Sequence, residues 1–346
     1  MDPPKELPFK VRPFEKDVQE RITRDFGKGF PKGFVKANHW DVVLMGHVTE
    51  EMLQQCYNKP VQDGDIWVVS LPKCGTTWTQ EMVWLLANDL KYETATRPLD
   101  DRYNFLEFSL LHDPDHVRNM FAEAKKLAPE MTLDPAQRLA VSTQHSRFVK
   151  SHLPMSLNPP DLLKKAKCLQ VIYVARNPKD MVVSYFNHLK ALKLQGFDSD
   201  FATLFEHFIN GQTLETPFFP HVLEAWHLRR HPNMCFIFYE DMKKDLRSVI
   251  TKVAKFLGKT LTDEQMEKLV NHLHIDNMRK NPNVNNEFLR DVPGLMDPER
   301  SFINKGQTGS WKAHLTPEMV KKMDAWIEEN LLGTDLSFVD QLTTEQ

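Results

Sequence analysis

The chain has few cysteines and almost no excess of charge of either sign, and both shortages limit what it can be. Four cysteines are spread over 346 residues, without CxxC or Cys/His zinc spacing. They predict free thiols in a reducing compartment rather than a disulfide framework. Lysine and arginine number 44 against 47 acidic residues, a formal net charge of -3. The sequence therefore offers no broad basic surface for nucleic acid or an anionic membrane.

Long apolar runs are also missing. The N-terminal stretch MDPPKELPFKVRPFEKD mixes charge with proline, where a secretory signal peptide would need a continuous apolar segment. No later segment supplies the roughly 18 consecutive apolar residues of a membrane-spanning helix. We therefore expect a cytoplasmic protein with no membrane and no nucleic-acid partner.

Short apolar runs, each followed by a stretch with helical spacing, dominate the middle of the chain. The runs predict buried strands over residues 66–71, 169–175 and 234–239, and a weaker strand over 147–150. The stretches with helical spacing cover residues 78–89, 180–194 and 248–257. This alternation predicts an α/β fold, with a central parallel β-sheet flanked by helices in a single domain.

The remaining segments are less informative. We expect the domain to span residues 61–346. Residues 1–60 hold several prolines and are predicted to be an N-terminal embellishment packed on that domain. Further helices are expected over residues 115–138, 198–230 and 316–332. Residues 281–298, rich in proline and asparagine, predict a long mobile loop.

Cationic side chains follow several of the predicted strands. Lys73, the pair Lys150 and His152, and Arg176 each come directly after a strand, and Glu240 follows another. Ligands of open parallel sheets bind beyond the carboxyl ends of the strands. This edge of the sheet is therefore predicted to bind an anion.

The first strand-to-helix crossing carries the most specific signal, the string PKCGTTW at residues 72–78. Glycine allows a tight turn, the amides at a helix N-terminus face an anion, and Lys73 adds a full charge. The lysine precedes the glycine, so this is not the GxxxxGK[ST] loop, which weakens a kinase or NTPase interpretation. KxG alone favours an ordinary turn, but KxGTTW recurs by chance only on the order of once per million windows.

Several separated motifs appear together in one order. They are PKCGTTW at 72–78, KSHLP at 150–154, RNPKDMVVSY at 176–185, FYED at 238–241 and KGQTGSWK at 305–312. With them the chain resembles the cytosolic sulfotransferase family over residues 61–332. The resemblance implies a P-loop-nucleotide-kinase-like fold and a donor, 3'-phosphoadenosine 5'-phosphosulfate (PAPS), which leaves as PAP. It implies no metal, and a small, hydrophobic acceptor such as a phenol, steroid, catecholamine or retinoid.

The resemblance also assigns roles at the sulfuryl group. Lys73 would contact the bridging oxygen of the leaving phosphosulfate, and Lys150 would stabilise the sulfuryl oxygens. His152, whose ordinary pKa near 6.5 suits the task, would take the proton of the acceptor as general base in an in-line displacement. A histidine taken alone is more often structural, and only the KxHLP context favours catalysis.

Other positions match the family's nucleotide contacts. Arg176 and Ser184 match its 3'-phosphate grip, although Arg176 taken alone could form a surface ion pair with Asp180. The 5'-phosphate would lie on the donor loop and the adenine between aromatic side chains. The full donor set is Lys73, Cys74, Gly75, Thr76, Thr77, Trp78, Arg176, Ser184, Tyr239, Leu273, Met278, Asn304, Lys305 and Gly306.

The pattern breaks in three places. Asn304 stands where the family usually has an arginine, which predicts weaker binding of the 3'-phosphate. Leu273 and Ile275 stand where the family often has threonine and phenylalanine. The family's dimer motif is degraded at Pro317 and Lys321, so a monomer and a homodimer both remain open.

Two alternatives to a simple sulfotransferase remain open. The first half of the chain also resembles the insect branch of the family that includes retinol dehydratase, where a sulfate ester can go on to lose water. The departures at Asn304 and Ile275 would suit a PAPS-binding or ligand-carrying protein without turnover, but Lys73, Lys150 and His152 argue against it. The apolar segments 103–111 and 205–219 are candidates for an acceptor pocket, although core packing is the safer interpretation.

Overall fold

The computed structural model describes residues 5–26, 32–38, 40–111, 118, 119, 122, 126, 147–163, 169–193, 196–291, 294–304 and 306–340. The strands are β1 (Arg12–Pro13), β2 (Phe34–Ala37), β3 (Val42–Met45), β4 (Ile66–Val69), β5 (Asn104–Phe105), β6 (Phe148–Ser151), β7 (Gln170–Ala175) and β8 (Met234–Phe238). The helices in the first half are α1 (Lys16–Phe26), α2 (Glu50–Tyr57), α3 (Thr76–Ala87), α4 (Leu99–Arg102), α5 (Phe108–Leu111) and α8 (Pro178–Ala191). The later helices are α9 (Phe201–Ile209), α10 (Phe218–His227), α11 (Tyr239–Lys244), α12 (Leu246–Phe256), α13 (Asp263–His272), α14 (Ile275–Lys280) and α15 (Pro317–Leu331).

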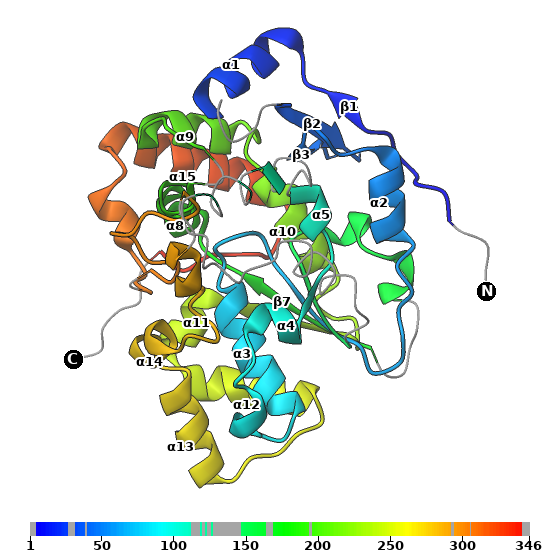
Figure 1. Cartoon of the computed structure of the whole chain (residues 1–346), viewed down its shortest axis with the longest axis vertical. Helices are drawn as coiled ribbons and strands as arrows, with labels where there is room; N and C mark the ends of the chain where they lie inside the picture. The colour runs from blue at the N-terminus through cyan, green and yellow to red at the C-terminus, as the bar shows by residue number, and fades with distance from the viewer. Residues whose placement is uncertain are drawn as a thin grey trace.

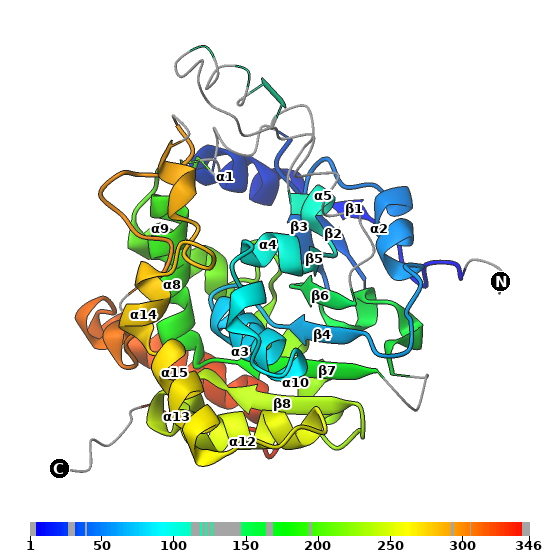
Figure 2. The same cartoon turned by 60° about the horizontal axis from the view of Figure 1, so that its bottom comes forward.

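A five-stranded parallel sheet, in the order β5-β6-β4-β7-β8, forms the centre of the described structure (Figure 2). The four strands predicted from apolar runs are confirmed, each to within two residues at either end. Strand β5 was missed, because a strand of two residues carries no periodicity. The predicted α/β class is therefore correct.

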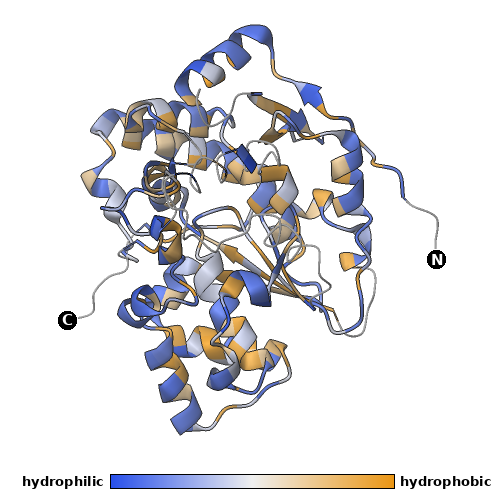
Figure 3. Cartoon of the chain, in the orientation of Figure 1, coloured by the Kyte–Doolittle hydropathy of each residue, from blue (hydrophilic) through white to orange (hydrophobic). Residues whose placement is uncertain are grey.

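Both faces of the sheet are covered, which explains why its strands read as continuous apolar runs. Successive side chains on a strand point to opposite faces. Ile66 and Val68 of β4 pack into a core shared with α3, α12 and α13, whereas Trp67 and Val69 pack into a second core shared with α8 and α10. Figure 3 shows the strands as mainly hydrophobic and the outlying α13 as mainly hydrophilic.

The N-terminal segment forms its own small sheet, which the sequence pattern did not indicate. Strands β1, β2 and β3 pair antiparallel in that order. Its core includes Ile22, Phe34 and Leu44, and it also takes in Tyr185 and Leu189 of α8. Figure 1 shows these elements at the opposite end of the molecule from α12 and α13.

Several helix predictions need correction. Helix α3 begins at Thr76 rather than Trp78, because Gly75 in a left-handed conformation already ends the turn. Residues 198–230 are not one helix but α9 and α10, separated by a turn in which Gly211 has a φ of 62° and Pro217 precedes α10. The helix over 316–332 is confirmed as α15.

Two of the predicted segments are only partly covered. Residues 115–138 lie almost entirely outside the described residues. The described residues of 281–298 include a short 3-10 turn, η5 (Glu287–Asp291), and an isolated antiparallel bridge from Met296 to Leu192, and the mobility of this segment stays a prediction. No helix in the described part of the chain is long and apolar enough to cross a membrane.

Candidate active site

The loop between β4 and α3 presents the uncapped N-terminus of a helix. Its turn depends on two left-handed residues, Lys73 with a φ of 63° and Gly75 with a φ of 101°. The first intrahelical bond runs from Thr79 N to Gly75 O, and no side chain in the described part of the chain caps the helix. The amides of the first turn, at Thr76 and Thr77, therefore have no partner within the helix and form a site for an anion.

Gly75 is required by space as well as by backbone conformation. A Cβ at this position would lie 2.7 Å from the Tyr239 ring. The neighbouring Cys74 is buried in the core shared with α8 and α10, where burial raises the pKa of its thiol to about 12. Cys74 can thus contribute its backbone to the loop, but not a thiolate.

Lys73 sits among other cations and aromatic rings. Its Nζ lies 3.3 Å from His188 Nδ1 and 4.9 Å from the centre of the Phe302 ring. Burial lowers the pKa of Lys73 to about 7, and the charges of Arg176 and Lys150 act in the same direction. An anion bound in the loop would relieve this repulsion and restore the charge of Lys73.

Arg176 joins the donor loop to a later segment of the chain. Its Nη1 donates to Lys73 O at 3.0 Å and its Nη2 to Gln307 O at 3.2 Å, while the guanidinium lies 4.2 Å from the Tyr239 ring centre. Its Nε is buried without a partner among the described residues, so one donor remains open for a ligand. The guanidinium is buried, so the interpretation as a surface ion pair with Asp180 is wrong.

The residues matched to the 3'-phosphate lie close together where the structure describes them. Asn304 Nδ2 donates to Ser184 Oγ at 3.3 Å. Gly306 has a φ of 64°, and a Cβ there would lie 2.9 Å from Ile275 Cγ1. Lys305 lies outside the described residues.

The residues matched to the adenine pocket share one core. Trp78 and Tyr239 meet edge to face with their ring centres 5.7 Å apart. Trp78 Nε1 donates to Leu273 O at 2.9 Å, and Met278 is buried in the same core. The structure thus brings together four predicted positions, from α3, the start of α11, the residue after α13, and α14.

His152 is held in one tautomer. Its Nδ1 lies 2.7 Å from Ser70 O, and since a carbonyl can only accept, Nδ1 carries the proton. The lone pair is therefore on Nε2, as a general base requires. Burial and the charge of Lys150 keep the pKa of His152 well below its ordinary value, so the ring is neutral at physiological pH.

Lys150 and His152 meet at a shared aromatic ring. Lys150 Nζ lies 3.9 Å from the centre of the Phe105 ring, and the His152 ring meets the same ring edge to face at 5.5 Å. Burial lowers the pKa of Lys150. Phe105 belongs to the apolar segment 103–111, so part of this segment lies at the site, whereas Phe205 and Phe218 of the second segment are core.

Several buried polar residues at the site were missed by the sequence. The His152 amide donates to Glu107, and His221 Nε2 donates to His152 O at 3.0 Å. Glu107 and Glu215 are both buried, each keeps one carboxylate oxygen without a partner among the described residues, and burial raises the pKa of both. The only signal in the sequence was a charged residue within each apolar segment.

Glu240, which was expected at this edge, supports the turn behind Arg176. Its carboxylate accepts from Asn177 N at 3.0 Å, and burial raises its pKa to about 7. In the described part of the chain, no group of three or more histidine, cysteine and acidic side chains is placed to hold a metal ion.

Together, the fold and the site define an α/β protein in which a helix N-terminus suited to an anion lies near a buried, neutral histidine. The family model described as "Sulfotransferase domain" matches residues 63–335. The chain therefore belongs to the sulfotransferase family and is an enzyme of this class.

Individual relatives agree with this assignment. Luciferin sulfotransferase of Photinus pyralis is 32% identical over 94% of this chain and 86% of its own. Sulfotransferase 1A1 of Mus musculus is 32% identical over 84% of this chain and 93% of its own. The crystal structure of retinol dehydratase with retinol and PAP superposes with a TM-score of 0.86, at 34% identity over 97% of this chain and 100% of that chain.

Proposed function

We propose that the chain transfers the sulfuryl group of PAPS to the hydroxyl or amine of a small, hydrophobic acceptor. The observation that carries the proposal is that Ser70, directly after β4, contacts both the proposed base and the donor loop. Its carbonyl fixes the His152 tautomer at 2.7 Å, and its Oγ lies 2.7 Å from Thr76 Oγ1 in the donor loop. A base and an anion loop with a common anchor suit an in-line transfer between two bound substrates.

The residues at the donor loop and around it fit the binding of PAPS. The open Arg176 Nε and the uncapped amides at the start of α3 are hydrogen-bond donors that suit an anionic partner. Thr76 and Thr77 would hold the 5'-phosphate, with Ser184, Asn304 and Gly306 at the 3'-phosphate. Trp78, Tyr239, Leu273 and Met278 would surround the adenine.

In the proposed reaction, the acceptor oxygen forms a bond to sulfur as the bond from sulfur to the leaving phosphate oxygen breaks. His152 Nε2 takes the acceptor proton, and Lys73 stabilises the charge that develops on the leaving oxygen of PAP. Lys150 stabilises the negative charge on the sulfuryl oxygens during the transfer. The fold already holds these three side chains in position before the reaction.

A hydrophobic acceptor is favoured by the surroundings of His152. Phe105 lies against both Lys150 and His152, and the pKa of His152 is lowered mainly by burial. Retinol dehydratase, one of the structural neighbours, was crystallised with retinol and with androsterone. We therefore favour phenols, steroids and retinoids as acceptors.

Elimination is the second candidate function, favoured by the likeness to retinol dehydratase at a TM-score of 0.86. In that case an allylic sulfate ester would form first and then lose sulfate together with a proton, which gives the anhydro product. The same residues would perform the first step, so only the product distinguishes the two functions.

The test is to incubate the enzyme with PAPS and a panel of phenols, steroids, catecholamines and retinoids, and to analyse products by mass. A sulfate ester supports the main proposal, and an anhydro product supports elimination. PAP affinity without any product would favour a binding protein and contradict both.

Two further properties are proposed with the function. We place the enzyme in the cytoplasm, in keeping with the free thiols of Cys56, Cys74 and Cys235. We do not assign a dimer to the segment at the start of α15, because Pro317 occupies its first turn and Lys321 replaces the family's acidic residue.

A further inference from the structure

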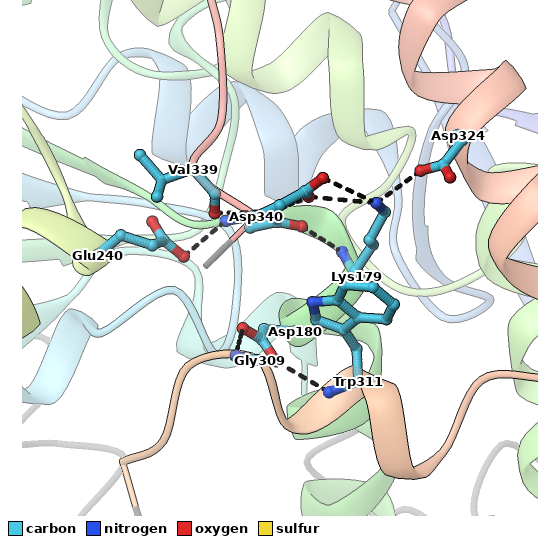
Figure 4. A network of polar contacts seen from close by, with 9 residues as sticks. Lys179, Asp180, Glu240, Gly309, Trp311, Asp324, Val339 and Asp340 are labelled. Carbon is cyan, nitrogen blue, oxygen red and sulfur yellow. Dashed lines mark hydrogen bonds and ion pairs between the residues drawn. The ribbon is translucent and has the colours of Figure 1, made fainter. Parts of the chain in front are cut away.

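One aspartate in the first turn of α8 holds most of the polar contacts of the segment that follows Asn304. Asp180 Oδ2 accepts from Gly309 N at 2.6 Å. Its Oδ1 accepts from Ser310 Oγ at 2.9 Å and from Trp311 N at 3.1 Å. Figure 4 shows the carboxylate lying directly against this segment. Asp180 is buried, so these bonds replace water contacts that the carboxylate has lost.

The segment held by Asp180 has little structure of its own. Among the described residues from 301 to 309, none belongs to a helix or a strand. Its backbone turns at Gly306 and Gly309, which have φ values of 64° and 76°. Hydrogen bonds to other parts of the chain must therefore fix the shape of this segment. The strongest of these contacts is with the buried Asp180 carboxylate, which accepts three hydrogen bonds.

Residues 176–184, which include Asp180, contact this segment at three points. Arg176 donates to Gln307 O at 3.2 Å, Asp180 binds residues 309–311, and Ser184 accepts from Asn304 at 3.3 Å. Arg176 and Ser184 are themselves proposed ligands of the 3'-phosphate. Of the three, only Asp180 has no free group to offer a nucleotide, so its role lies in holding the segment.

We propose that Asp180 is a positioning residue that sets the specificity of the enzyme for a 3'-phosphorylated nucleotide. By fixing Gly309 and Trp311, it holds Asn304 against Ser184 and Gln307 against Arg176, where the 3'-phosphate would bind. The inference rests on the proposed function, because it takes the donor to be PAPS. It concerns the choice between nucleotides with and without a 3'-phosphate.

The test compares the affinities of PAP and adenosine 5'-monophosphate by calorimetry. Asp180→Ala should weaken PAP binding about 10- to 100-fold and adenosine monophosphate binding less than about twofold. Asp180→Asn keeps one acceptor oxygen, so its affinity for PAP should lie between those of wild type and Asp180→Ala. In steady-state assays, KM for PAPS should rise while kcat at saturating PAPS stays within about twofold.

A matched control is available in another helix. Asp245 is an exposed aspartate at the start of α12 that accepts from Ser248 N at 3.0 Å, so it also accepts a backbone hydrogen bond but lies in a different helix. Asp245→Ala should leave the ratio of the two affinities unchanged. If Asp180→Ala does not fold, Ser310→Ala removes one of the three bonds and should lower the ratio about two- to fivefold.

The outcomes separate this inference from the proposed function. If the Asp180 variants lose affinity for PAP and adenosine monophosphate equally, or the ratio of the two affinities does not change, the positioning role is overturned while the proposed function stands. A wild-type enzyme that binds neither PAP nor PAPS would overturn the proposed function, and this inference with it.

Discussion

At the scale of single residues, burial rather than residue type sets the chemistry of the site. A histidine in water titrates near pH 6.5, but His152 is buried beside Lys150, and both factors disfavour its charged form. Its Nδ1 is committed to Ser70 O, so the neutral ring always presents Nε2. The base is thus available over a wider pH range than an exposed histidine would be.

The acid limb of the pH–rate profile tests this point. Because a base with a lowered pKa is protonated only when the pH falls below that lowered value, kcat/KM should stay level through pH 6.5 and fall only at lower pH. Lys150→Met removes a charge that lowers the pKa of His152, so its limb should move to higher pH. A wild-type limb at pH 6.5 or above would contradict the assignment.

Asn304 is the residue at which the chain departs most clearly from its family. It is half-buried and donates a neutral hydrogen bond to Ser184. Asn304→Arg should tighten PAP binding by about 1.5–3 kcal/mol, roughly 10- to 100-fold, since it adds a charge-assisted contact. Asn304→Gln controls for length without charge, and equal affinities for the two variants by calorimetry would refute this.

Some site residues could be predicted from the sequence and others could not, for a physical reason. Lys73, His152 and Arg176 sit in recognisable strings at strand ends, where the rules of parallel sheets apply. Glu107 and His221 act through backbone bonds to His152, 45 and 69 residues away along the chain. Such contacts depend on the packing of distant segments, which local pattern does not encode.

At the scale of elements, the junction of β4 and α3 determines whether the donor loop can form. Periodicity predicted a helix here but placed its start two residues late, because threonines and glycine carry no apolar signal. The same weakness merged α9 with α10. Long buried strands were predicted well, since a run of apolar residues identifies them directly.

Gly75→Ala tests the demands of this junction. The alanine would adopt a φ near 101° and its Cβ would meet Tyr239 at 2.7 Å, so both strain and overlap apply. We expect a loss of about 2–4 kcal/mol in the free energy of unfolding and a marked loss of PAP affinity. Urea unfolding and calorimetry provide the two measurements.

Gly258→Ala is the matched control for that variant. Gly258 has a φ of 68°, but a Cβ there would meet nothing within 4 Å. It should cost only the backbone term of about 1 kcal/mol and leave PAP binding unchanged. If the two variants behave alike, the contact with Tyr239 has no role.

At the scale of the whole molecule, the sheet separates two cores and carries the site at one edge, while the N-terminal sheet packs against α8. This arrangement buries several ionisable groups that a smaller protein would leave in water. Glu240 is one of them, and burial raises its pKa to about 7. Its protonation is therefore linked to the stability of the fold.

The linkage has a defined sign. A carboxyl whose pKa is higher in the folded state contributes stability below its unfolded pKa of about 4.5, and this is lost as the pH rises through about 7. The unfolding free energy of Glu240→Gln should therefore fall less between pH 5 and pH 7.5 than that of wild type, by about 1–3 kcal/mol. Parallel urea titrations at these pH values would show it, and identical pH dependence would refute it.

The central claim is that one site binds the donor and removes the acceptor proton. Its most direct test is a single-turnover measurement of radiolabelled sulfuryl transfer from PAPS to an acceptor, with wild type and His152→Ala, alongside PAP affinity. We predict transfer by wild type and a loss of about 100- to 10,000-fold in rate for the variant, with PAP affinity unchanged. Undiminished transfer by His152→Ala, or none by wild type to any acceptor of the panel, would contradict the account.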